Sequence, residues 1–241
     1  MPEIPRTEPA IEKHYQDFYS QRNPEKVYAV EFVVRTLLGT YPGLKLDRTV
    51  YRGAKILDLG FGDGRNMPLL HDLGFEIHGV EISEEICRLT QSRMGRLGVP
   101  VRLETGTNSH IPFGDGAFDF TLACHACYYV SPGERFADNL REIARILRAG
   151  GRFIFSLPKT DTYILKDAAP VGDGHYRITQ DPYGLRQGSV FRAFASKQEI
   201  VDELGVWFSD FALGLCENDF YGTYEKVWIG TCLRKNWGSE R

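Results

Sequence analysis

A buried-strand pattern that runs directly into a glycine-rich turn is the most constraining feature of this sequence. Residues 56–64 read ILDLGFGDG, apolar in the first half and with glycine at every second position in the second half. Glycine is needed where the backbone takes unusual dihedral angles or comes close to a ligand. A helix is expected at 65–73, and the free N–H groups at its start favour a negatively charged group. The run predicts a ligand-binding turn; a tight connection without a ligand is the alternative.

An acidic residue ends the next strand-like run, EIHGVEI at 76–82. This residue, Glu81, follows the glycine turn by roughly 20 residues, the spacing found in nucleotide-binding folds. A carboxylate there can accept hydrogen bonds from both vicinal hydroxyls of a ribose. An exposed acid at a helix start is the alternative for Glu81 alone. Together, the turn and Glu81 predict an adenosine-type ligand at the carboxyl ends of the strands.

Strand-like and helix-like segments alternate along most of the chain. Such alternation predicts a parallel sheet that is covered by helices on both faces. The last two strand-like runs, 208–215 and 226–233, are separated by too few residues for a helical crossover and are expected to pair antiparallel. The other expected strands are 55–60, 76–82, 101–106, 118–123 and 152–157, and the expected helices are 8–20, 25–40, 65–73, 83–97, 132–148 and 196–204.

A length of 241 residues favours one domain. Within it we expect an N-terminal helical lid (1–50), a cofactor-binding core (51–157), a substrate cap (158–195), and a C-terminal helix with a strand hairpin (196–241). The cap is expected to be an inserted hairpin, because turn signals at 172–174 and 181–184 separate its aromatic-rich runs.

Charge and cysteine content argue against some classes of protein. Lys and Arg number 29 against 32 Asp and Glu, so the broad positive field of a nucleic-acid binder is missing. The five cysteines are an odd number and 1–10 has no secretory pattern, which predicts a cytoplasmic protein. The longest uncharged stretch, 120–133, falls short of the ~20 apolar residues of a membrane span, so none is expected.

The spacing of the glycines separates two kinds of nucleotide site. A dinucleotide fingerprint reads GxGxxG, whereas this chain has GxGxG after an Asp. The run ILDLGxGxG resembles motif I of the class I S-adenosylmethionine-dependent methyltransferases, in particular the small-molecule branch that includes quinone-biosynthesis methyltransferases. Residues 80–83 (VEIS), 111–113 (IPF) with 118–119 (FD), and 140–151 (LREIARILRAGG) resemble three further motifs of that family in the same order. The resemblance covers roughly 54–157, and it implies a Rossmann-like doubly wound α/β sheet of seven strands with an antiparallel last strand.

The resemblance also implies roles for particular residues. Asp58 and the glycine backbone would hold the methionine end of S-adenosylmethionine, Glu81 the ribose, and Ile82 would flank the adenine. Most relatives have an acid for the adenine amino group where this chain has Thr107, so Asn108 or Ser109 would supply the acceptor. The implied cofactor-binding residues are Asp58, Gly60, Phe61, Gly62, Gly64, Glu81, Ile82, Thr107, Asn108, Ser109 and Ala123. No metal site is expected.

Two histidines are candidates for a general base. His125 follows the fourth strand, where many relatives have a histidine that faces the cofactor; it is either a base or a residue that only shapes the site. His175 of the cap is the second candidate, and a surface histidine without a role is its alternative. The Cys124-x-x-Cys127 spacing occurs in redox and zinc sites, but it lacks a second pair and is interpreted as packing.

The methyl acceptor is the part of the function that the sequence constrains least. Relatives use the N-terminal helix and the cap to close over the substrate, and both are rich in aromatic and cationic residues here. The candidate substrate-binding residues are Tyr15, Tyr19, Tyr128, Tyr176, Arg177 and Arg192. Rings that bear a carboxylate or phosphate suit such a lining, unless the acids of the cap pair with its cations.

We therefore expect O-methylation of a small acidic, sugar-like or phenolic molecule with S-adenosylmethionine as cofactor, and no nucleic-acid partner. A catalytically silent cofactor-binding or assembly protein and a nucleotide-dependent oxidoreductase on a related fold are the alternatives.

Overall fold

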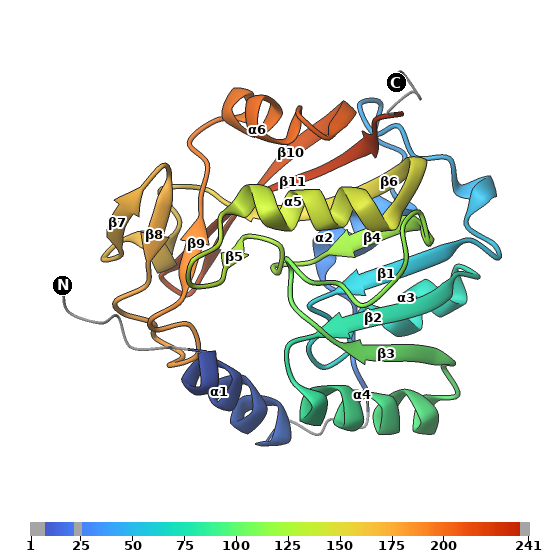
Figure 1. Ribbon diagram of the computed structural model, residues 1–241, viewed down its shortest axis with the longest axis horizontal. Helices are drawn as coiled ribbons and strands as arrows, with labels where there is room; N and C mark the ends of the chain where they lie inside the picture. Colours follow the sequence, from blue (N-terminus) through green and yellow to red (C-terminus); the bar gives the residue numbers. More distant parts are fainter. Residues whose placement is uncertain (1–7, 22–25, 237–241) are drawn as a thin grey trace.

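A seven-stranded sheet forms the centre of the computed structural model, which describes residues 8–21 and 26–236. Its strand order is β10-β11-β6-β4-β1-β2-β3, and β11 pairs antiparallel with both β6 and β10 (Figure 1). The pairs among β1, β2, β3, β4 and β6 are parallel. The expected α/β fold, with a parallel sheet and an antiparallel last strand, is therefore confirmed. The strands are β1 (Lys55–Leu59), β2 (Glu76–Glu81), β3 (Val101–Thr105), β4 (Phe118–Ala123), β6 (Leu147–Pro158), β10 (Phe208–Phe220) and β11 (Thr223–Arg234).

Helices cover both faces of this sheet because the strands are apolar on both sides. One face packs on α2 (Glu31–Leu38), α3 (Met67–Asp72) and α4 (Glu84–Leu97) through a core that includes Ile56. The other face packs on α5 (Phe136–Ile146) and α6 (Lys197–Leu204) through a core that includes Leu57. Successive residues of β1 thus point to opposite cores, as strand geometry requires.

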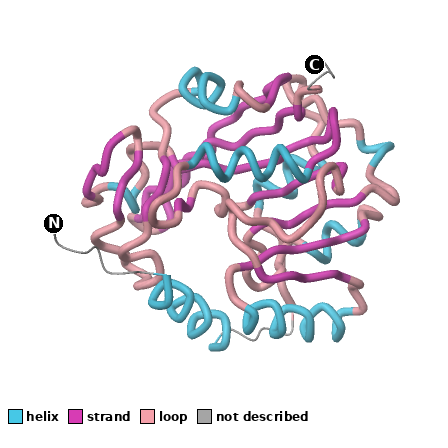
Figure 2. The backbone as a smooth tube through the Cα atoms, viewed as in Figure 1, coloured by secondary structure: helices cyan, strands magenta, loops and turns pink. Residues whose placement is uncertain are grey.

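A smaller four-stranded sheet forms the cap beside the carboxyl ends of the central strands (Figure 2). Its order is β5-β9-β8-β7, and all its pairs are antiparallel. The expected hairpin is the pair β7 (Ala169–Gly172) and β8 (His175–Arg177), to which β9 (Val190–Arg192) and β5 (Tyr129–Val130) add. Since β5 belongs to the loop after β4, the cap is joined directly to the core. A 3-10 turn, η2 (Tyr163–Leu165), lies between β6 and β7.

Three helices are shorter than expected from the sequence. The expected helix 25–40 spans only Glu31–Leu38, and residues 22–25 lie outside the described chain. The expected helix 132–148 begins at Phe136, because Asp138 caps the backbone N–H of Arg135, and it ends where Leu147 turns extended and enters β6. The expected helix 65–73 spans Met67–Asp72.

The N-terminal segment places a helix beside the central domain. Helix α1 (Glu8–Gln21) packs against α4, below the cap in Figure 1. A 3-10 turn, η1 (Arg48–Val50), precedes β1. No helix in the described parts of the chain is long and apolar enough to cross a membrane.

Candidate active site

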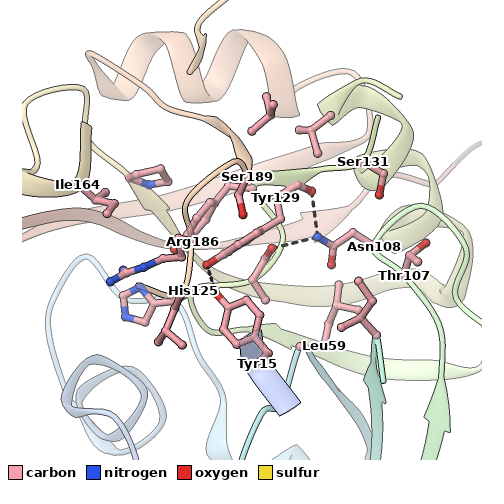
Figure 3. A pocket seen from close by; sticks show the side chains of 18 of the residues that line it. Tyr15, Leu59, Thr107, Asn108, His125, Tyr129, Ser131, Ile164, Arg186 and Ser189 are labelled. Atoms are coloured by element: carbon pink, nitrogen blue, oxygen red, sulfur yellow. Dashed lines mark hydrogen bonds between the residues drawn. The ribbon is translucent and has the colours of Figure 1, made fainter. Parts of the chain in front are cut away.

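A cavity of about 830 Å³ opens where the carboxyl ends of β1, β2 and β4 meet the cap and α1. This edge of the sheet, where strand order reverses between β1 and β4, is where ligands bind in doubly wound folds. Volumes of ~300–1,000 Å³ are typical of sites for small molecules. Figure 3 shows part of the cavity wall, in which Tyr15, Asn108, His125, Tyr129 and Arg186 surround one space.

The turn after β1 has the backbone conformation that its glycines predicted. Gly60 and Gly62 have φ of +67° and +55°, values that side-chain-bearing residues rarely adopt. A Cβ on Gly60 would come within 2.4 Å of the Cβ of Ala126. Gly60 and Phe61 line the cavity, whereas Gly62 and Gly64 are not part of its wall. At Gly64 the close neighbour of an added Cβ is Thr90 of α4, which indicates packing between helices.

Glu81 ends β2 and turns its carboxylate back towards this turn. One carboxylate oxygen accepts from the N–H of Gly62 at 3.3 Å, and the other accepts from the N–H of Ile82 at 2.5 Å. Burial raises the pKa of Glu81 to about 6, although both hydrogen bonds lower it. Glu81 and Ile82 line the cavity. The structure therefore brings the predicted ribose-binding carboxylate to the predicted turn.

Asp58 lies beneath the turn and is almost fully buried. Neither carboxylate oxygen has a hydrogen-bond partner within the described chain. Burial, and to a smaller extent the charges of Asp63 and Glu81, raise the pKa of Asp58 to about 8. Because an unpaired buried charge is costly, this carboxyl holds its proton at neutral pH unless a positive group approaches. Asp58 does not line the cavity itself, and neither does the fully buried Ala123.

The segment after β3 contains the three candidates for the adenine contact, and only two of them line the cavity. Thr107 and Asn108 line the cavity. The Asn108 amide nitrogen donates to the carbonyls of Ala126 at 3.0 Å and Tyr129 at 3.1 Å, which leaves its amide oxygen as the acceptor. Ser109 donates to Glu134 at 2.5 Å and is not part of the cavity wall. Of the two acceptors expected from the sequence, the structure places only Asn108 at the cavity.

His125 lies in the cavity in a conformation that few residues adopt. Its φ is +56°, and its backbone N–H donates to the Ser156 hydroxyl at 2.9 Å. The imidazole packs edge-on against Phe32, with 5.7 Å between ring centroids. Burial lowers the pKa of His125 to about 4, and the positive charges of Arg186 and Arg65 lower it further. The ring is therefore neutral at physiological pH and a weaker base than an exposed histidine.

Helix α1 lines the cavity beside the glycine turn. The hydroxyls of Tyr15 and Tyr129 are 2.6 Å apart, and Gln16 donates to the Ser83 hydroxyl at 2.7 Å. Tyr19 lies against Gly62. Burial raises the pKa of both Tyr15 and Tyr19, so these phenols are neutral. Tyr15, Tyr19 and Tyr128 line the cavity, and their contact with a substrate stays a prediction.

The cap places only some of its predicted residues at the cavity. His175 and Arg177 line it, and the Nε2 atom of His175 is buried without a hydrogen-bond partner in the described chain. Tyr176 packs against the hydrophobic core instead and does not line the cavity. Arg192 also points elsewhere. Its buried guanidinium pairs with Glu199 at 2.8 Å and Glu203 at 2.6 Å, and so ties the cap to α6.

Several charged residues of the cavity were not among the predicted site residues, and Arg186 and Glu225 are two of them. Arg186, in the loop after β8, and Glu225, in β11, both line the cavity. The sequence of the cap gave one indication of Arg186, because acids and cations of the cap were expected to pair. Asp181 does pair with Arg186 at 3.0 Å. Asp161 pairs with Lys159 and Lys226 as well, so the expectation that acids of the cap pair with cations is confirmed for these two. No motif in the sequence near Glu225 predicts that this residue lines the cavity.

A parallel sheet with a glycine turn after β1 and a carboxylate after β2 defines an α/β protein built for a nucleoside-type cofactor. Comparison with known proteins indicates which kind of cofactor-binding protein this chain resembles. The family described as "Methyltransferase domain" matches residues 57–155. The uncharacterised methyltransferase YcgJ of Bacillus subtilis is 28% identical over 160 residues, which are 64% of this chain and 60% of that protein. The sterol 4-C-methyltransferase strm-1 of Caenorhabditis elegans is 29% identical over 110 residues, 44% of this chain and 32% of that protein. The chain thus spans less than two thirds of these curated relatives.

Solved structures show the same fold at lower identity. An S-adenosylmethionine-dependent methyltransferase from Methanosarcina mazei has a TM-score of 0.62 at 19% identity, covering 81% of this chain and 98% of that one. The 1,6-didemethyltoxoflavin-N1-methyltransferase of Burkholderia thailandensis, solved with S-adenosylhomocysteine, has a TM-score of 0.60 at 18% identity, covering 98% and 93%. Residues 57–155 therefore match a methyltransferase family, and the chain has the fold of S-adenosylmethionine-dependent methyltransferases. These matches confirm the predicted resemblance to that family and its cofactor, S-adenosylmethionine, whereas the resemblance to the quinone-biosynthesis branch stays a prediction.

Proposed function

We propose that this protein transfers the methyl group of S-adenosylmethionine to a hydroxyl oxygen of a small molecule. One observation carries the proposal: a single cavity joins the glycine turn and Glu81 to a chamber of tyrosines and charged side chains beneath the cap. The first part has the chemistry for the cofactor, and the second has the chemistry for an acceptor. The whole cavity measures about 830 Å³, within the range of sites for small molecules.

The residues at the turn fit the cofactor. Glu81 would accept the ribose hydroxyls, Ile82 would flank the adenine, and the Asn108 amide oxygen would accept from the adenine amino group. Asp58, buried without a hydrogen-bond partner in the described chain, suits the positively charged amino group of the methionine end. When bound, S-adenosylmethionine supplies a methyl group on a sulfonium, which is already a good leaving group. The protein's own task is then to place the acceptor in line with that methyl group and exclude water.

The lining beneath the cap suits a hydroxylated ring. Tyr15, Tyr128, Tyr129 and Tyr163 give aromatic surface, and Arg186 gives a cation for an acidic substituent. The tyrosines themselves stay neutral, because burial raises the pKa of Tyr15, Tyr128, Tyr129 and Tyr163. This set favours the phenolic or acidic acceptors among those expected from the sequence.

A direct test incubates the purified chain with S-adenosylmethionine that carries a deuterated methyl group and with a panel of phenols, hydroxybenzoates and acidic sugars. Mass spectrometry then looks for the labelled methyl group on each acceptor. Labelled ether products would support the proposal. If S-adenosylhomocysteine binds but no acceptor is ever labelled, the protein is a silent cofactor-binding protein. If NADH binds in its place, the oxidoreductase alternative is correct.

A further inference from the structure

Two opposite charges line the acceptor side of the cavity without pairing with each other. Arg186 comes from the cap and Glu225 from the central sheet, and the charge of Arg186 acts on the Glu225 carboxyl. No ion pair joins them within the described chain, although both are largely withdrawn from solvent. Opposite charges that share a partly buried space but stay apart leave room for a ligand that contacts both.

Arg186 is held firmly and yet keeps one nitrogen free of protein partners. Its Nε and Nη2 donate to the two carboxylate oxygens of Asp181 at 3.0 and 3.1 Å, and Nη2 also donates to the Tyr163 hydroxyl at 3.0 Å. The Asp181 side chain is completely buried, so this pairing fixes the guanidinium. No hydrogen bond within the described chain uses Nη1. Nη1 therefore has two N–H groups for an anionic or carbonyl oxygen.

Strand geometry turns Glu225 into the cavity. Lys226 points outwards, where it pairs with Asp161 and Glu217, whereas Glu225 and Val227 both line the cavity. The Glu225 carboxylate receives no hydrogen bond from the described chain. The titratable groups that face it are Cys124 and Tyr128 after β4, Tyr163 of η2, Cys216 of β10 and Arg186. Burial raises the pKa of Glu225, and Arg186 lowers it by a smaller amount.

We propose that Arg186 and Glu225 form the acceptor site: Arg186 Nη1 binds a carboxylate on an aromatic ring, and Glu225 accepts the proton of a hydroxyl on the same ring. The acceptor is then an aromatic hydroxy acid. This inference rests on the proposed function and deepens it. It assigns the general base to Glu225, whose carboxylate is unpaired, and leaves His125 as a neutral wall of the cavity.

The step balances with the groups named. A bond forms between the hydroxyl oxygen and the methyl carbon, and the bond from that carbon to the sulfonium sulfur breaks with its electron pair staying on sulfur. The hydroxyl proton passes to the Glu225 carboxylate, which later returns it to water. A carboxylate with a raised pKa is a better proton acceptor than an exposed one, which suits this role.

Binding measurements test the site without depending on turnover. We would saturate the protein with S-adenosylhomocysteine and titrate it by calorimetry with 2-, 3- and 4-hydroxybenzoate, phenol and benzoate. One hydroxybenzoate is expected to bind about tenfold more tightly than both phenol and benzoate, because each lost group removes a hydrogen bond to a charged partner. The ratio of the affinity for this hydroxybenzoate to the affinity for benzoate should increase as pH rises through the pKa of Glu225. The reason is that the ionised carboxylate is the form that accepts the hydroxyl proton.

Two variants separate the two contacts. Arg186→Lys keeps a cation for Asp181 but loses Nη1, and it should weaken hydroxybenzoate binding about tenfold while leaving phenol binding unchanged. Glu225→Gln keeps the shape of the side chain, and it should make the advantage over benzoate smaller and independent of pH. Glu217→Gln is the matched control, because Glu217 is half exposed and lies outside the cavity wall; its binding should equal that of the wild type.

The outcomes distinguish this inference from the proposed function. If S-adenosylhomocysteine does not bind, the proposed function itself fails. If it binds but the wild type shows no preference for a hydroxybenzoate, or both variants keep the wild-type preference, only the assignment of Arg186 and Glu225 is overturned.

Discussion

The hydroxyl of Tyr19 lies so close to Gly62 that a Cβ on the glycine would come within 2.3 Å of it. Helix α1 thus covers the same turn that the cofactor is expected to use. Two further contacts hold the helix there: the Tyr15 to Tyr129 hydroxyl pair and the hydrogen bond from Gln16 to Ser83. We therefore expect cofactor exchange to require movement of α1 away from the turn.

Weakening this closure should speed cofactor exchange. Gln16→Ala removes one hydrogen bond between α1 and the start of α4, a loss of about 1 kcal/mol. The dissociation rate of S-adenosylhomocysteine, measured by stopped-flow fluorescence, is expected to rise about fivefold. Gln198→Ala on α6, where the exposed side chain donates to Asp202 one turn further along the helix, is the control. Equal rates in Gln16→Ala and the wild type would mean that α1 does not limit exchange.

Asp58 should lose its proton when the positively charged end of the cofactor binds. Its pKa of about 8 means that the carboxyl is mainly protonated at pH 7 in the free protein. Calorimetry of S-adenosylhomocysteine binding in buffers of different ionisation enthalpy should show proton release at pH 7. Asp58→Asn has no proton to release, so its binding enthalpy should depend less on the buffer. The same buffer dependence in both proteins would contradict this role of Asp58.

The same group predicts a pH dependence of stability. The pKa of Asp58 is raised from 3.8 to about 8 on folding, so between these values the folded state binds more protons than the unfolded state. The free energy of unfolding should therefore fall as pH rises through this window. Asp58→Asn should show a shallower fall in urea titrations of the cofactor-free protein. A fall as steep as in the wild type would show that Asp58 is ionised in the folded protein.

Arg192 should matter for stability and not for ligand binding. Its guanidinium is buried between Glu199 and Glu203 of α6, so Arg192→Met leaves carboxylates without their partner. We expect this change to lower the free energy of unfolding by about 3 kcal/mol. The affinity for S-adenosylhomocysteine should be measured well below the melting temperature. It should stay within twofold of the wild type, which corresponds to about 0.4 kcal/mol of binding free energy. Unchanged stability in Arg192→Met would contradict the structural role of these ion pairs.

His125→Asn tests the first of the two histidine candidates for a general base. Asn tolerates the positive φ of this position, so the backbone should be retained. Because His125 is already neutral, kcat is expected to fall by less than about 100-fold, the lower end of what general-base catalysis contributes. The change should appear mainly in KM, through the altered cavity wall. A much larger fall in kcat than rise in KM would make His125 a catalytic residue.

Local signals in the sequence predicted the core of the fold and the cofactor side of the site. The turn at 56–64 was predictable because the buried strand, the glycines and the following helix are adjacent in the chain. Glu81 was predictable because it ends the next strand, and parallel strands end at the same edge of a sheet. The structure brings both together through the hydrogen bond from Gly62 to Glu81.

Long-range contacts explain what the sequence did not predict. Pairing of β5 with β9 joins segments about 60 residues apart, a separation at which strand patterns carry no information on partners. Arg186 and Arg192 occur in the same aromatic-rich segment, yet one faces the cavity and the other faces α6. Their neighbours in sequence do not distinguish them, because the tertiary arrangement of the cap decides where each side chain points.

The central claim, that the glycine turn and Glu81 bind S-adenosylmethionine, is tested most directly by calorimetric titration with S-adenosylhomocysteine and NADH. The wild type should bind S-adenosylhomocysteine and not NADH. Glu81→Ala should weaken this binding at least about tenfold through the loss of the charged hydrogen-bond acceptor, whereas Glu84→Ala, on the exposed start of α4, should not. Equal affinity in the wild type and Glu81→Ala, or binding of NADH alone, would contradict the account.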